Sequence, residues 1–183
     1  MELDEHGWIK VNEHLETSKE NIWAVGDAIG KHMFRHTANY ESKIVLHNLL
    51  KAKNKEDRKI ADFHAVPHAV FTYPHVAGVG LKESDALEAG LKILVGRAKY
   101  QDVAMGVAMA DEHGFMKVIL EENGKILGAS AIGPMAEELV QQVVYLMNTE
   151  HQDLMPVVES QVIHPTINEV LVQAFSDLEH PII

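Results

Sequence analysis

Two apolar segments joined by an Asn-Gly pair constrain the fold of this chain more than any other feature. The segments run from Phe115 to Glu121 and from Lys125 to Ile132, and Asn123-Gly124 lies between them. Asn-Gly between apolar segments is the strongest short-range hairpin signal, because a type I′ turn needs positive φ at both central positions. The sequence therefore predicts an antiparallel β-hairpin with a type I′ turn.

Apolar residues continue after the hairpin at helical spacing over residues 135–149. The residues on this stripe are Ala136, Leu139, Val140, Val143, Val144 and Met147. Their spacing indicates an amphipathic helix with one buried face. Further strands are expected over 69–72, 76–81 and 91–95. We also expect a short helix from Lys82 that ends at Gly90, irregular or extended chain over 100–109 and a helical turn over 153–155. This order predicts an α+β domain, an antiparallel sheet with helices packed on one face.

A shorter leading piece precedes this domain. It is expected to hold strands over 7–15 and 22–25 and a helix over 36–53. The charged sequence that follows indicates a solvated linker. We therefore predict a leading piece at 1–53, a linker at 54–64 and the main domain at 65–183.

The segment from Gln161 to Gln173 holds the main candidate for chemistry. Pro165 suits a first helical turn, and Ile167, Val170, Leu171 and Ala174 then form a helical stripe. Glu169 lies five residues past His164 and could reach back to it. A carboxylate on one ring nitrogen raises a histidine's basicity and fixes its tautomer, as a general acid–base needs. On spacing alone, a His-Pro pair at a helix start is more often a capping detail.

Asp27 is a second candidate, because it follows Gly26 directly after the expected strand at 22–25. α/β folds present groups to ligands at such strand ends. The alternative is an ordinary turn aspartate, which is the commoner case. Gly78 and Gly80 do not form a dinucleotide fingerprint, because Glu83 occupies the place of the third glycine.

Composition excludes several functions. The net charge of −11 argues against a nucleic-acid partner. The chain has no apolar run of membrane-spanning length and no signal peptide at its start, so a cytoplasmic protein is expected. With no cysteine, a disulfide framework, a thiol nucleophile and a zinc–thiolate site are all excluded.

The twelve histidines raise the question of a metal site. The i, i+4 pairs His32/His36 and His64/His68 have ligand spacing, but neither holds a zincin carboxylate and Pro67 argues against a helix around the second. No metal site is predicted, and a histidine-rich metal-binding protein is the weakest alternative.

Four separated segments, in this order, resemble the flavin-dependent pyridine nucleotide–disulfide oxidoreductases, closest to the dihydrolipoamide dehydrogenases and also similar to glutathione reductase. The segments are Asn21–Asp27 (the second flavin motif), Met33–His36, Phe71–Leu81 (the start of the interface domain) and His164–Glu169 (the catalytic signature). The resemblance spans nearly the whole chain. It implies the C-terminal dimerisation domain of such an enzyme, preceded by a short piece of its FAD-binding domain.

The resemblance also implies roles for residues. Asp27 would bind the ribityl side of FAD, and Met33, Phe34, Arg35 and His36 would line the flavin. His164, oriented by Glu169 and followed by a cis proline, would protonate or deprotonate the dithiol form of a dithiol/disulfide substrate in the other subunit's active site. FAD and NAD would be the cofactors, and the chain would pair with itself as a homodimer and with FAD and NAD domains.

The chain departs from this family in lacking the leading G-x-G-x-x-G, the redox cysteine pair and the nicotinamide domain. We therefore expect the chain to be a fragment that, on its own, has no oxidoreductase activity and does not bind FAD. Val162 stands where a second histidine is common in the dihydrolipoamide dehydrogenases, and Asn168 stands where serine is common. Lipoamide, glutathione and a related disulfide all stay open as substrates. A stand-alone dimerisation or binding module without redox chemistry remains the alternative from another class.

Overall fold

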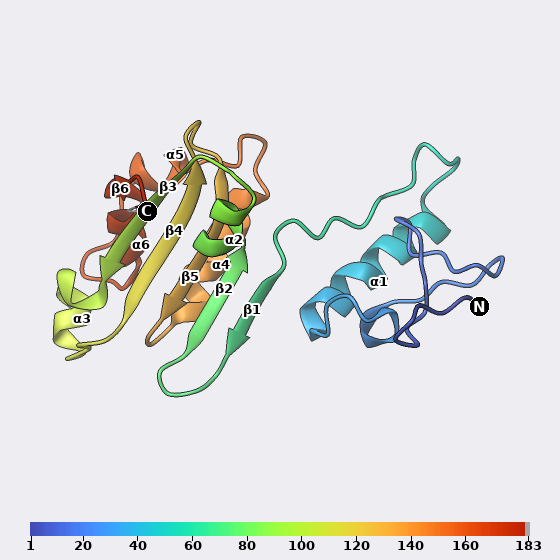
Figure 1. Cartoon of the computed structure of the whole chain (residues 1–183), viewed down its shortest axis with the longest axis horizontal. Coiled ribbons are helices and arrows are strands. Elements are labelled where there is room, and N and C mark those ends of the chain that lie inside the picture. Colours follow the sequence, from blue (N-terminus) through green and yellow to red (C-terminus); the bar gives the residue numbers. More distant parts are fainter. Residues whose placement is uncertain (182–183) are drawn as a thin grey trace. The chain divides into compact units, whose positions relative to one another are not determined.

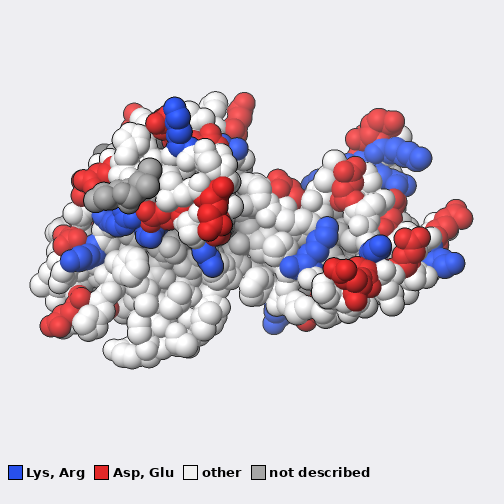
Figure 2. Space-filling view, viewed as in Figure 1, with Lys and Arg blue, Asp and Glu red and all other residues white. Residues whose placement is uncertain are grey.

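The computed structural model describes residues 1–181 and divides the chain into two compact units, Met1–Phe63 and His64–Ile183 (Figure 1). The division falls at the end of the segment expected as a linker. Among the described residues, no helix combines the length and the apolarity needed to cross a membrane. On the face seen in Figure 2, acidic and basic side chains are scattered over each unit.

The first unit contains one 3-10 helix, η1 (Gly26–Ile29), and one long helix, α1 (Arg35–Leu50). The strands expected over 7–15 and 22–25 are wrong: these segments form only isolated bridges, Leu3–Ile9, Val11–Thr17 and Glu16–Trp23. The backbone has positive φ at Gly7, Leu15 and Asn21, at 88°, 64° and 60°. Because the chain changes direction every few residues, no ladder extends past one bridge. The helix expected over 36–53 is present as α1 and ends three residues earlier.

The second unit is built on one six-stranded sheet in the order β1-β2-β5-β4-β3-β6. Every neighbouring pair is antiparallel. The strands are β1 (Pro67–Val70), β2 (Val76–Gly80), β3 (Ile93–Lys99), β4 (Phe115–Glu121), β5 (Ile126–Ile132) and β6 (Leu178–Glu179). The expected hairpin is therefore confirmed, and it forms the centre of the sheet.

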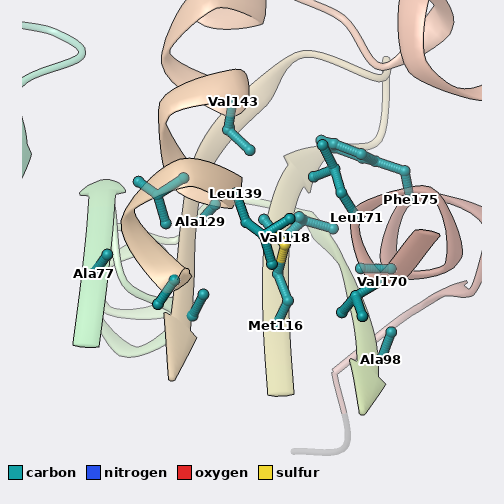
Figure 3. Close-up of a cluster of buried hydrophobic side chains, with 14 of the residues drawn as sticks. Ala77, Ala98, Met116, Val118, Ala129, Leu139, Val143, Val170, Leu171 and Phe175 are labelled. Atoms are coloured by element: carbon teal, nitrogen blue, oxygen red, sulfur yellow. The ribbon is translucent and has the colours of Figure 1, made fainter. Parts of the chain in front are cut away.

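Two helices, α4 (Ala136–Met147) and α6 (Asn168–Ser176), cover one face of this sheet. The shorter ones are α2 (Glu83–Glu88), η2 (Tyr100–Asp102), α3 (Ala104–Ala108) and α5 (Met155–Val158). Side chains from alternate positions of β4, including Met116 and Val118, meet Leu139 and Leu171 in the main core (Figure 3). Ile119 points to the other face and packs with Ala86 of α2 in a smaller cluster. The predicted α+β class, with its main helices on one face, is confirmed.

Three local expectations for the second unit are wrong. Residues 100–109, expected to be irregular or extended chain, form η2 and α3. The hairpin turn is not type I′, because Gly124 has φ of 89° but Asn123 is not among the residues with positive φ. The amide of Gly124 bonds to Glu121 O and the amide of Glu121 to Lys125 O, so the glycine alone takes the left-handed position. Pro165 is not in the first turn of a helix, since α6 begins at Asn168.

Candidate functional site

The structure brings His164 and Glu169 together. His164 Nδ1 lies 2.8 Å from Glu169 Oε1, and the second carboxylate oxygen accepts the backbone N–H of Thr166 at 3.0 Å. The His164 side chain is 68% exposed and that of Glu169 is 25% exposed. The carboxylate is thus held from both sides, while the imidazole projects into solvent.

Local backbone geometry and core packing fix this pair. The His164–Pro165 bond is cis, as the family resemblance implies, and Thr166 Oγ1 donates to Ile163 O at 2.8 Å. Glu169 lies in the first turn of α6, whose buried face anchors it to the sheet. That face consists of Val170, Leu171, Ala174 and Phe175. The short loop before α6 places the His164 ring against the first turn of that helix.

The electrostatics of the pair favour an ionised glutamate. The hydrogen bond from His164, together with the Thr166 amide, lowers the pKa of Glu169 from its ordinary value. An ionised carboxylate only accepts hydrogen bonds, so the proton of the neutral ring belongs on Nδ1. Nε2 is then the ring atom that can take up or release a proton at the surface.

A cavity of about 260 Å³ lies between α4, α5 and α6 and is lined by residues that neighbour the pair in sequence, Ile163 and Asn168. Its lining includes Gln142, Ser160, Ile163 and Asn168. Gln142 Nε2 donates to Asn168 Oδ1 at 2.8 Å, which joins α4 to the first residue of α6 next to Glu169. Asn168, noted in the sequence only as a departure from serine, therefore connects the two main helices.

A second histidine–glutamate pair was missed from the sequence. His75 Nδ1 lies 2.9 Å from Glu137 Oε2, and the two side chains are 36% and 27% exposed. The partners are 62 residues apart, so no short motif could indicate the contact. It joins the segment after β1 to the first turn of α4.

The residues resembling a flavin motif lie in the first unit. Asp27 is exposed in η1, and Met33, 52% exposed, lies shortly before α1. Phe34 is the residue before α1, and its ring stacks on that of His36 with centroids 5.1 Å apart. Arg35 is exposed at the first position of the helix. An exposed carboxylate can accept hydrogen bonds from the sugar hydroxyls of a flavin nucleotide, and apolar and aromatic side chains can pack on its ring, so these residue types are compatible with the group.

Metal ligation finds no support in the described part of the chain. Over residues 1–181, no group of three or more histidine, aspartate or glutamate side chains could hold a metal ion. His64 Nε2 instead contacts Met147 O at 2.9 Å, and the His32 ring packs against Phe63.

Two models of known protein families match the chain. The model of the pyridine nucleotide-disulphide oxidoreductase dimerisation domain matches residues 66–175, more than half of the sequence. The chain belongs to this family. A second model, of pyridine nucleotide-disulphide oxidoreductases, matches residues 1–42. The expected family and the division into a dimerisation domain and a preceding short piece agree with both matches.

Curated relatives carry different names. Mycothione reductase from Mycobacterium tuberculosis is 36% identical over 176 residues, which cover 95% of this chain and 38% of that protein. Dihydrolipoyl dehydrogenase from Chlamydia muridarum is 33% identical over 168 residues, which cover 91% of this chain and 35% of the relative. The chain thus spans less than two-fifths of either relative.

Solved structures agree with this fold. The flavoprotein disulfide reductase RclA from Escherichia coli matches with a TM-score of 0.79 and 30% identity, over 96% of this chain and 40% of that one. LpdA from Mycobacterium tuberculosis matches with a TM-score of 0.85 and 19% identity, over 96% and 37%, which supports the fold alone.

Proposed function

We propose that this chain supplies the His164–Glu169 acid–base pair to the active site of an FAD-dependent NAD(P)–disulfide oxidoreductase, acting in the partner subunit of a homodimer. The observation that carries the proposal is the 2.8 Å contact between His164 Nδ1 and a carboxylate whose other oxygen holds the Thr166 amide. This arrangement leaves Nε2 on an exposed ring.

The proposed chemistry is proton transfer at Nε2. The ring removes the proton from a substrate thiol, and the resulting thiolate is the species that attacks a disulfide. In the opposite direction, Nε2–H protonates a departing thiolate. Glu169 keeps Nδ1–H in place and stabilises the imidazolium that forms between these steps. FAD, held in part by Asp27 and the residues Met33–His36, would supply the exchange of electrons with the nicotinamide.

For the substrate, we propose a dihydrolipoamide-type dithiol, on the strength of the dihydrolipoyl dehydrogenases among the relatives. A second candidate is the disulfide of a low-molecular-weight thiol, favoured by the mycothione reductases that are 36% identical to the chain. Comparing kcat/KM for dihydrolipoamide and for such disulfides in the holoenzyme separates the two.

The test of the acid–base role is His164→Ala in the holoenzyme that contains this region. Dithiol–disulfide turnover is expected to fall by about 10²–10⁴-fold, the usual contribution of a positioned acid–base group. Transfer of hydride from NAD(P)H through the flavin to an artificial acceptor is expected to persist. His75→Ala is the matched control, because it removes another histidine whose Nδ1 lies within hydrogen-bond distance of a glutamate and should leave turnover unchanged. Equal loss of both activities in the His164 variant would exclude the proposed role.

Light scattering and visible absorbance of the 183-residue chain test the remaining parts. We expect a colourless dimer. A monomer would contradict self-association through this domain, and a stoichiometrically yellow preparation would contradict the expectation that the chain alone does not hold FAD.

A further inference from the structure

Glu41 in the middle of α1 is completely buried, with 0% of its surface exposed. Its Oε2 accepts the backbone N–H of Gly26 at 2.5 Å. Its Oε1 has no hydrogen-bond partner among residues 1–181. Buried carboxylates normally satisfy both oxygens, since desolvation strongly disfavours an incompletely bonded charge or hydroxyl. An apolar side chain of similar size would suit this helix position better if packing were its only role.

The partner of Glu41 lies at the start of the flavin-like turn. Gly26 opens η1 with φ of 67°, and a β-carbon there would come within 3.2 Å of Ala38 Cβ on α1. The first amides of a helix lack partners inside the helix. Val25, the residue before η1, provides no side-chain cap. Glu41, 15 residues further along the chain, instead accepts this first amide and ties η1 to α1.

Asp27 directly follows the bonded amide and is exposed. The direction of its carboxylate therefore depends on the conformation of the turn at Gly26. Glycine adopts positive and negative φ with similar ease, so the residue type alone does not fix this conformation. A hydrogen bond from a backbone amide to a completely buried carboxyl oxygen is shielded from competition by water, so it restrains the amide strongly.

We propose that Glu41 is a positioning residue that fixes the Gly26–Asp27 turn so that Asp27 is presented to the flavin nucleotide. The inference rests on the proposed FAD-binding role of Asp27. A positioning role for Glu41 differs from a purely stabilising role in one consequence. Removing the carboxyl acceptor weakens FAD binding without a matching fall in melting temperature.

Substitutions at two buried positions on one face of α1 test this proposal. Glu41→Gln keeps an oxygen acceptor of the same reach, whereas Glu41→Met removes the acceptor at similar volume. Thr37→Val is the matched control, because Thr37 lies one turn earlier, is 3% exposed, and its hydroxyl has no partner among the described residues. Glu41→Asp, which retracts the carboxylate by one methylene, replaces the methionine variant if that variant does not fold.

Two readouts are needed. Amide hydrogen exchange of Gly26 and Asp27, measured by NMR on the 183-residue chain, is expected to accelerate by about tenfold or more in Glu41→Met and to change little in Glu41→Gln and Thr37→Val. In the holoenzyme, the FAD Kd of Glu41→Met is expected to rise by about tenfold or more, the scale of one lost buried hydrogen bond. The melting temperature should stay near that of the Thr37→Val control.

Asp27→Asn separates this inference from the proposed function. Weaker FAD binding in Asp27→Asn together with unchanged binding in Glu41→Met would overturn the positioning role alone. Unchanged FAD binding in Asp27→Asn would overturn the proposed role of Asp27 itself and with it the functional part of the inference. A fall in melting temperature with unchanged FAD affinity in Glu41→Met would assign Glu41 to stability only.

Discussion

Gly96 in β3 allows α6 to lie directly against the sheet, and replacing it with alanine should destabilise the second unit. An added β-carbon would stand 1.8 Å from the carbonyl oxygen of Ala174, whereas ordinary van der Waals contact requires 3.4–4 Å. The obstacle is backbone and cannot rotate away, so α6 must move by about 1.6 Å or the strand must bend. Overpacking of this kind typically costs about 1–3 kcal/mol, and a backbone clash belongs at the upper end.

We therefore expect Gly96→Ala to lower the free energy of unfolding by about 3 kcal/mol, with a fall in melting temperature on the order of 10–20 °C. Both tryptophans, Trp8 and Trp23, lie in the first unit, so their fluorescence reports on Met1–Phe63. The second unit needs far-UV circular dichroism and amide exchange, in which the α6 amides should lose protection most.

Gly90→Ala provides the control for this substitution. Gly90 has φ of 72° after α2, and a β-carbon added there would meet no atom within 4 Å. Alanine at this position should cost only about 1–2 kcal/mol of backbone strain. If Gly96→Ala unfolds no more easily than Gly90→Ala, the close approach of α6 to β3 does not limit stability and the reasoning fails.

Three further predictions concern the second unit. Leu139→Ala should lower the free energy of unfolding by about 2–5 kcal/mol in urea titrations, because Leu139 is fully buried between α4 and the sheet. The hydrogen bond from Lys117, with help from Arg97, lowers the pKa of Glu83. The contribution of Glu83 to folding stability is therefore complete above its ordinary pKa of 4.5 and is lost as the pH falls through its pKa in the folded protein. Glu83→Gln should therefore flatten the acid limb of a stability–pH curve. The pKa of Glu169 is lowered mainly by its hydrogen bond from His164. In an NMR titration, the His164 ring resonances should therefore shift as acid protonates Glu169 below its ordinary pKa of 4.5. Glu169→Gln should abolish that shift.

Periodic patterns made the second unit predictable. β4, β5 and α4 are continuous elements whose apolar residues repeat at strand or helix spacing, and each lies within a few residues of its expected bounds. The first unit lacks such repeats, and its residues at 7–15 form single bridges between turns. Short alternating segments without a partner ladder are not stable strands, which sequence alternation alone cannot reveal. The prediction of a type I′ turn was wrong because Asn-Gly also suits a turn in which only the glycine is left-handed.

Sequence distance decided how much of the site could be foreseen. His164 and Glu169 are five residues apart, so their contact follows from local geometry at the start of α6. His75–Glu137 and Gly26–Glu41 span 62 and 15 residues and depend on tertiary packing. The roles of Asp27 and of Met33–His36 rest on the family resemblance, because exposure at the starts of η1 and α1 by itself indicates no ligand.

The two edges of the sheet restrict how copies of this domain can associate. The outer strand β6 has only two residues, and β1 has four and begins with Pro67. Short edges and a residue without an N–H offer few hydrogen-bond donors to a strand from another molecule. Growth of the sheet across molecules is therefore disfavoured, which also guards against open-ended aggregation. Self-association, which the dimerisation-domain family implies, would then depend on contacts between side chains and not on strand pairing, and the geometry of such contacts can limit an assembly to two copies.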